Sequence, residues 1–428
     1  MGSIAIDTLI RDQIPAEEPG AAVAVLKAGQ TLHCQGYGLA NLEWKQPITP
    51  QTVFGLGSTT KPFTATALML LEQQEKLHLD DPIQTYLPEY PTGEHQVTLR
   101  HLLTHTSGIP NFVSRPEFWE QHAYTIASPE AVVALFKDLP FDFAPGTRYS
   151  YSNSGYVLLG LVLERLTSLS YAEVIRQSLF APLGMKHSCY LEPGPIILYR
   201  ASGYEPAEQG YQHERDAAPA VKYAAGGLGS TLEDLAIWDA ALREERLLNH
   251  ATQARMEEPL RLADGQRENY GLGWGVGHYR QRRYVCHAGG VPGYRAFFGR
   301  FPDEAVAIII LSNRAGFDPA RLAGQISQIV FDLPPRAREP VALQPATLSK
   351  MVGTYNSMFG KVEVKEEARG LLYVNHEVSH PLIPMSETSL YQADDAETEL
   401  HFEHPNEQGV YSRLRVFEPF HWHTAERV

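Results

Sequence analysis

Apolar residues recur at two spacings along this chain, and each spacing predicts a different kind of element. Repeats of three to four residues place an apolar stripe on one face of a helix. Short apolar runs bounded by glycine, proline or polar residues are typical of strands. The helical spacing occurs at residues 64–76, 156–166, 171–179 and 232–242. The strand-like runs are residues 21–26, 31–39, 284–287, 296–301 and 305–311.

The strand-like runs lie near both ends of the region that precedes residue 331, and the helical segments lie between them. Gly29 separates the first two runs, which predicts a hairpin. Apolar faces of strands and helices must be buried against one another. We therefore expect one sheet built from both ends of this region, with helices that cover it and a helical lobe beside it.

The last 80 or so residues have a different pattern, in which apolar and polar residues alternate. The alternation is clear at residues 360–367, 370–377, 398–405 and 409–418, with turn residues between these segments. Such short alternating runs predict a small antiparallel β domain, either a barrel or a half-barrel. A stretch with four prolines, residues 331–345, precedes it and predicts an exposed linker. The expected organisation is residues 1–332, a linker at 333–345, and residues 346–428.

The net charge and the composition argue against several classes of function. Lysine and arginine total 36 and aspartate and glutamate total 50, so the net charge of −14 disfavours nucleic acids and anionic membranes as partners. No apolar run approaches the roughly 18 residues of a membrane span, and no secretion signal is visible. The expected location is therefore the cytoplasm, although a removed signal stays open. The three cysteines, Cys34, Cys189 and Cys286, form no disulfide or metal pattern.

The first candidate motif is Ser58-Thr59-Thr60-Lys61. Positions three apart share a helix face, so the Lys61 amine can reach the Ser58 hydroxyl. Pro62 is tolerated only in the first turn of a helix, which predicts a helix start within a residue or two of Ser58. Backbone N–H groups there can hold an oxyanion, and a buried lysine can act as a base. The alternative is that Ser58 is a plain N-cap.

The second candidate motif is Tyr151-Ser152-Asn153, at the start of a predicted helix. A phenol near ammonium groups can have a lowered pKa and carry protons. The amide of Asn153 can donate to a substrate carbonyl. The same pattern recurs around Tyr373, which we interpret as an ordinary strand aromatic in the β domain.

The third candidate motif is His287-Ala288-Gly289-Gly290. Glycines allow a strand edge to approach a ligand closely, and one backbone N–H there could complete an oxyanion hole with the N–H of Ser58. The alternative is a glycine-rich hairpin with a satisfied histidine. Each of the three motifs is short enough to occur by chance.

The order and surroundings of the three motifs together resemble the serine β-lactamase-like family of penicillin-recognising hydrolases. This family includes class C β-lactamases, family VIII esterases, DD-peptidases and D-aminopeptidases. The resemblance covers about residues 15–330. Its further motifs are residues 54–57, 79–82, 86–88, 98–108, 145–146, 225–230 and 270–275. It implies an α+β (α/β) fold with an antiparallel sheet flanked by helices and a helical lobe. The trailing β domain resembles the lipocalin-like modules of D-aminopeptidases.

The resemblance also implies roles for the motif residues. Ser58 is then the acylated nucleophile, while Lys61 and Tyr151 share the general-base and general-acid work. Asn153 positions the scissile carbonyl, and Gly289 and Gly290 belong to the substrate-binding strand, with Gly290 as the second oxyanion donor. His287 stands where β-lactamases and DD-peptidases usually carry a lysine, and a histidine at this position resembles D-aminopeptidases. A neutral histidine makes a salt bridge to a substrate carboxylate less assured.

The expected function is a metal-independent serine hydrolase, without a cofactor, that acts through an acyl-enzyme on amide bonds of small peptides, including those with a D-residue. A carboxylesterase, a class C-like β-lactamase and a non-catalytic penicillin-binding sensor remain as alternatives. Small molecules or short peptides are the expected partners, and a homo-oligomer is possible. His101 and His105 are spaced like zinc ligands, but Leu102 replaces the glutamate of that motif, so both are interpreted as structural.

Overall fold

The computed structural model describes residues 2–357, 360–367, 370–375 and 378–428, apart from the side chains of Pro116, His421 and Trp422. The chain divides into two compact units, Met1–Pro319 and Ala320–Val428. Each unit has its own hydrophobic core.

The first unit contains a six-stranded antiparallel sheet in the order β12-β13-β14-β15-β1-β2. Its strands are β1 (Ala21–Lys27), β2 (Gln30–Tyr37), β12 (Gly275–Tyr279), β13 (Arg282–Val291), β14 (Tyr294–Phe301) and β15 (Val306–Ser312). Strand β1 pairs with β15 from Ala21↔Ser312 to Lys27↔Val306, so the two ends of the unit meet in the middle of the sheet. The predictions of a hairpin near Gly29 and of one sheet built from both ends are confirmed.

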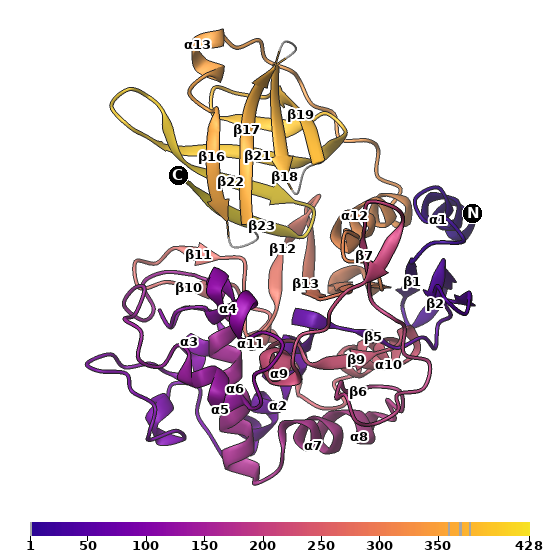
Figure 1. The fold of residues 1–428 in the computed structure, drawn as a ribbon, viewed down its shortest axis with the longest axis vertical. Helices are drawn as coiled ribbons and strands as arrows, with labels where there is room; N and C mark the ends of the chain where they lie inside the picture. Colours follow the sequence, from indigo (N-terminus) through magenta and orange to yellow (C-terminus); the bar gives the residue numbers. More distant parts are fainter. Residues whose placement is uncertain (1, 358–359, 368–369, 376–377) are drawn as a thin grey trace. The chain divides into compact units, whose positions relative to one another are not determined.

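Ten helices lie along the described chain between β2 and β12. They are α2 (Lys61–Gln73), α3 (Leu99–Leu103), α4 (Pro116–Gln121), α5 (Pro129–Ala134), α6 (Asn153–Thr167), α7 (Tyr171–Ile175), α8 (Ala181–Leu183), α9 (Pro219–Gly226), α10 (Leu232–Arg243) and α11 (His250–Met256), with α1 (Gly2–Arg11) at the start. Helix α10 packs on β1 and β15, while α3 and α5 pack on α6. Figure 1 shows α3, α5 and α6 gathered in one lobe.

The four predicted helices are present, with one shortened. The segment predicted at 171–179 is helical only to Ile175 and continues as a π-helical turn, Arg176–Phe180. Short 3₁₀ turns are η1 (Gly57–Thr60), η2 (Ile83–Thr85), η3 (Phe112–Ser114) and η5 (Pro302–Glu304).

Short strands tie the loops together. A three-stranded sheet, β5-β9-β6, joins the segment just before Ser58 to distant parts of the chain. The short strands are β3 (Leu39–Asn41), β4 (Gln46–Pro47), β5 (Phe54–Gly55), β6 (Cys189–Tyr190), β7 (Tyr204–Pro206), β8 (Tyr211–His213), β9 (Leu228–Ser230), β10 (Leu260–Arg261) and β11 (Arg267–Glu268).

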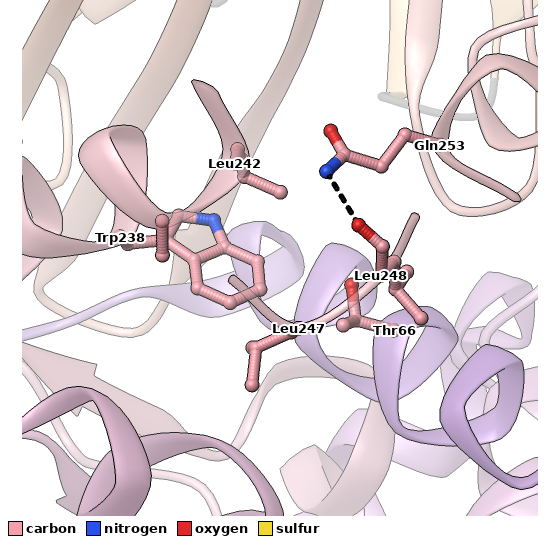
Figure 2. Close-up of a pocket in the computed structure, with 7 residues that line it drawn as sticks. Thr66, Trp238, Leu242, Leu247, Leu248 and Gln253 are labelled. Carbon is pink, nitrogen blue, oxygen red and sulfur yellow. Dashed lines mark hydrogen bonds between the residues drawn. The ribbon is translucent and has the colours of Figure 1, made fainter. Parts of the chain in front are cut away.

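Helix α2 is anchored by aromatic packing on α10. The ring of Phe63 stacks on that of Trp238 with centroids 4.4 Å apart. A small hollow beside this contact is lined by Thr66, Trp238, Leu242 and their neighbours (Figure 2). The Thr66 hydroxyl and the Trp238 indole N–H are buried there, and neither has a hydrogen-bond partner within the described residues. The hollow is therefore a place in the core where two buried polar atoms lack partners among the described residues, beside mostly apolar side chains and Gln253.

The second unit is a closed antiparallel β-barrel of eight strands preceded by α12 (Pro319–Val330) and α13 (Pro345–Leu348). The strands are β16 (Gly353–Ser357), β17 (Gly360–Glu367), β18 (Gly370–Asn375), β19 (Val378–Pro384), β20 (Ser389–Gln392), β21 (Asp395–Pro405), β22 (Tyr411–Glu418) and β23 (His421–Arg427). Pairing of β16 with β23 closes the barrel. Alternate side chains such as Val362, Val364 and Leu414 fill its interior, as the alternating pattern predicts. Within the described residues, no helix is long and apolar enough to cross a membrane.

Candidate active site

Ser58 lies in the 3₁₀ turn η1, which runs directly into α2 at Lys61. Pro62 occupies the first turn of α2, where its missing N–H costs nothing. Ser58 and Lys61 are three residues apart on this continuous turn, and Lys61 Nζ lies 3.0 Å from Ser58 Oγ. Ser58 is the N-cap of neither η1 nor α2, whose caps are Leu56 and Thr60, and it is partly exposed, so a substrate can reach its hydroxyl.

The amine of Lys61 is fully buried and lies within hydrogen-bond distance of three oxygen atoms. Besides Ser58, it donates to Asn153 Oδ1 at 2.8 Å and to the carbonyl oxygen of Ala225 at 2.9 Å. Burial lowers the pKa of Lys61 well below its ordinary value. A neutral amine has two N–H bonds and one lone pair. The two oxygens that can only accept take the N–H bonds, which leaves the lone pair for the Ser58 hydroxyl.

The carbonyl of Ala225 is aimed at Lys61 by a strained backbone. Tyr223, within α9, has φ 31° and ψ −131°, a conformation that a bulky residue rarely adopts. Two hydrogen bonds fix the chain that follows it against the start of α2. Thr64 Oγ1 donates to the carbonyl of Ala224 at 2.7 Å, and the Leu228 N–H donates to Thr60 Oγ1 at 3.1 Å. Sequence reasoning missed this contribution because a backbone carbonyl carries no side-chain signal.

Tyr151 lies over Lys61, whose Nζ is 4.7 Å from the centre of the phenol ring. The phenol hydroxyl is buried, and within the described residues it makes no hydrogen bond of normal distance and angle. Burial raises the pKa of Tyr151, and the nearby Ser58 hydroxyl opposes this only in part. The expectation of a lowered phenol pKa is therefore wrong, because burial outweighs any nearby positive charge. Tyr151 is a neutral phenol that can give a proton more readily than it can remove one.

Asn153 is the first residue of α6 and is held at both its backbone and its side chain. Its backbone N–H donates to Asn111 Oδ1 at 3.0 Å. Its own Oδ1 accepts from Lys61. The Nδ2 group is then the part of the amide that remains to donate to a ligand.

His105, which the sequence pattern indicates to be structural, packs directly on the catalytic candidates. Its ring centroid lies 4.2 Å from that of Tyr151, in a cluster that also contains Tyr149, Tyr156 and Tyr270. Burial lowers the pKa of His105 well below its ordinary value. His101 takes part in a capping box with Thr98, which is a structural role.

Both ring nitrogens of His287 have partners. Nε2 lies 3.0 Å from the hydroxyl of Tyr270, and Nδ1 lies 2.6 Å from the carbonyl oxygen of Ala288. A carbonyl oxygen can only accept a hydrogen bond, so we assign a proton to Nδ1 of His287, facing Ala288. Both ring nitrogens of His287 are thus engaged by groups of the protein itself.

The glycines of β13 allow the strand edge to touch the turn that carries Ser58. A Cβ atom on Gly289 would lie 2.0 Å from the carbonyl oxygen of Leu56, and one on Gly57 would lie 2.6 Å from the nitrogen of Gly290. Gly57 also has φ 52°, in the left-handed region. Pairing with β12 ends at Cys286, so this edge of β13 is not covered by β12 beyond that residue.

The arrangement brings together a hydroxyl, a buried amine with a lowered pKa, a phenol, an amide and a glycine edge within the first unit. These are parts sufficient for nucleophilic attack on a carbonyl and for proton transfer to a leaving group. Tyr373 lies in the barrel core instead. Among the described residues, no group of three or more histidine, cysteine, aspartate or glutamate side chains is placed to hold a metal ion.

Comparison with known proteins gives consistent results. Residues 6–330 match the family described as Beta-lactamase. The chain is similar to "Penicillin-binding protein 4*" of Bacillus subtilis, with 30% identity over 86% of this chain and 87% of that protein. It is 28% identical to a D-aminopeptidase of Gluconobacter oxydans over 78% of this chain, but spans only 64% of that protein's length. The octameric penicillin-binding protein homologue from Pyrococcus abyssi is similar in structure, with a TM-score of 0.71, 26% identity and 100% coverage of both chains.

Proposed function

Because the chain belongs to the Beta-lactamase family, we propose that it is a metal-independent serine hydrolase that cleaves amide bonds of small peptides, including those with a D-residue, through an acyl-enzyme. The observation that carries this proposal is the contact between the buried amine of Lys61 and the Ser58 hydroxyl, at 3.0 Å. A lysine with a lowered pKa is a base that can activate a serine at neutral pH.

In the first step, the lone pair of Lys61 accepts the Ser58 proton as Ser58 Oγ bonds to the carbonyl carbon of the substrate. The carbonyl oxygen becomes an oxyanion, for which the N–H groups of Ser58 and Gly290 are the proposed donors. An oxyanion donor contributes about 100- to 1,000-fold to the rate. The Nδ2 group of Asn153 orients the substrate from the opposite side.

In the second step, Tyr151 donates its proton to the leaving amine as the C–N bond breaks. The raised pKa of Tyr151 supports this role, because a neutral phenol holds a proton to give. The proton that Lys61 accepted then restores the phenol. Water attacks the acyl-enzyme with Lys61 again as base, and Ser58 is released with its proton.

An acyclic amide substrate is favoured over a β-lactam by the partners of His287. Both of its ring nitrogens are engaged within the protein, by Tyr270 and by the carbonyl of Ala288, and not by a ligand. The D-aminopeptidase relative supports the same preference. The octameric relative further supports a homo-oligomer, which light scattering on the purified protein would test.

The decisive experiment combines active-site labelling with a substrate screen. A fluorophosphonate probe should add to Ser58, as peptide mass spectrometry would show, and D-aminoacyl amides should be hydrolysed faster than p-nitrophenyl esters or a chromogenic cephalosporin. L-aminoacyl amides serve as the stereochemical control. Ser58→Ala should lose both labelling and turnover while its melting temperature is retained, since Ser58 makes no cap. Turnover by Ser58→Ala would remove Ser58 as the nucleophile, and stable labelling without any turnover would favour a penicillin-binding sensor.

A further inference from the structure

A polar pocket lies beyond the end of β13, within the first unit. It encloses about 280 Å³, and its walls include Arg200, Glu214, Asp216, Pro292 and Tyr294. Pro292 follows β13 directly and is two residues beyond Gly290. The pocket is thus joined by a short piece of backbone to the strand edge that faces Ser58.

The charges that line this pocket are unevenly neutralised. Asp216 is paired with Lys222 at 2.6 Å and with Arg200 at 3.3 Å. Glu214 accepts a hydrogen bond from the Gly293 N–H at 2.6 Å, and in the described part of the chain it has no ion pair. Burial raises the pKa of Glu214, and the nearby carboxylates of Glu205 and Asp216 raise it further, while the Gly293 N–H and the charge of Arg295 act against this. Glu214 is therefore the carboxylate of the pocket that lacks a directly bonded cation.

The proposed mechanism fixes the direction in which a substrate crosses this region. Tyr151, the proposed donor to the leaving amine, has its ring 6.3 Å from that of His287. The leaving group therefore lies toward His287, at the near end of the glycine edge. The acyl part of the substrate must then point the other way, from Gly290 toward Pro292.

The pocket is close to Gly290 along the chain. Pro292 lies in the two-residue turn between the paired residues Val291 and Tyr294. Consecutive Cα atoms are about 3.8 Å apart, so the Cα of Pro292 lies at most about 7.6 Å from that of Gly290. A lysine side chain carries its ammonium about 6 Å from its Cα, from ordinary bond lengths, so a side chain of this length on the acyl residue suits that separation.

We propose that this pocket is an acyl-side subsite, in which Glu214 binds a cationic group of the substrate. The inference rests on the proposed function and goes beyond it by naming a preferred substrate class, amides whose acyl residue has a long side chain ending in an ammonium. Arg200 and Lys222 do not oppose this binding fully, because Asp216 lies between them and is paired with both.

The test compares p-nitroanilides of lysine, norleucine and glutamate in the stereoisomer that the enzyme hydrolyses. Lysine and norleucine have side chains of similar length and differ in the terminal charge. A hydrogen bond between charged groups is stronger than one between neutral groups, so kcat/KM for lysine should exceed that for norleucine by about tenfold or more. Glu214→Gln should bring the ratio close to one, while it keeps an oxygen to accept from the Gly293 N–H.

The matched control is Glu205→Gln. Glu205 is a nearby carboxylate on β7 that is bonded to Gln212 at 2.7 Å and does not line the pocket. This variant should keep the lysine preference. The proposal is overturned if the wild-type enzyme hydrolyses both anilides equally, if it prefers glutamate, or if both glutamate variants change the ratio alike. If the enzyme hydrolysed neither anilides nor amides, the proposed function would be rejected instead, and the subsite with it. If Glu214→Gln does not fold, the wild-type ratio alone decides.

Discussion

His105 accepts a hydrogen bond at Nδ1 from the backbone N–H of Ser152, at 3.1 Å. Ser152 stands between Tyr151 and Asn153, so one histidine fixes the backbone that carries both of these candidate residues. The carbonyl of His105 also accepts from the N–H of Ser150, at 2.9 Å. His105 itself has φ 58°, a left-handed conformation that costs energy in most residues. A strained residue with two contacts to one catalytic segment indicates a positioning role.

We expect His105→Ala to lower kcat by about tenfold or more with little change in KM, since a small displacement of proton-transfer groups is costly. His105→Asn should recover much of this loss, because asparagine has an acceptor at a similar place and tolerates a left-handed backbone. Steady-state kinetics and melting temperatures of the two variants would check this. Equal kcat values for both variants would contradict a role for the acceptor.

The pH dependence of turnover should have an acid limb set by Lys61. Its lowered pKa means that the amine gains a proton only at lower pH, and a protonated amine has no lone pair for Ser58. Thus kcat/KM should rise with pH through that pKa. Lys61→Arg, which stays charged, should lose about 100- to 10,000-fold and show no such limb. A pH–rate profile of both enzymes checks the assignment, which fails if the acid limb persists in Lys61→Arg.

Gly289 and Gly290 should respond differently to the addition of one methyl group. In Gly289→Ala the new Cβ would lie 2.0 Å from the carbonyl of Leu56, so the strand edge must separate from the Ser58 turn. In Gly290→Ala its closest contact would be ordinary, 3.5 Å to Arg295. We expect a melting temperature several degrees lower for Gly289→Ala, corresponding to about 1–3 kcal/mol, and a change of about 0.5 kcal/mol or less for Gly290→Ala. Equal destabilisation of the two variants would contradict the close approach of Gly289 to the Ser58 turn.

Two threonines of α2 provide a matched pair for stability. The Thr66 hydroxyl is buried without a partner among the described residues, whereas that of Thr64 bonds to the carbonyl of Ala224 and lies 2.7 Å from the hydroxyl of Tyr171. Valine has nearly the same shape as threonine. Thr66→Val should therefore stabilise the protein by about 1 kcal/mol, and Thr64→Val should destabilise it by about 1–3 kcal/mol. Chemical denaturation would measure both, and a loss of stability in Thr66→Val would show that its hydroxyl is satisfied.

Much of the fold followed from local patterns. The apolar periodicity located α2, α6 and α10, and the alternation after residue 360 predicted the barrel. The predicted ends of the helices were less accurate where the hydrogen-bonding pattern of the helix changes. At Ile175, for example, α7 passes into a π-helical turn. Side-chain periodicity does not report such a change, because the apolar face continues through it.

The sequence by itself determined the secondary-structure elements and the part of the candidate site whose residues are close in the chain. The spacing of Ser58 and Lys61 and the position of Pro62 are local features, and they place the hydroxyl and the amine together at the start of a helix. Only the tertiary structure decided the protonation states and the partners. The low pKa of Lys61, the raised pKa of Tyr151 and the occupied nitrogens of His287 all arise from burial and from contacts between segments far apart in the chain. Desolvation depends on what surrounds a group in three dimensions, and no local pattern of residues specifies that.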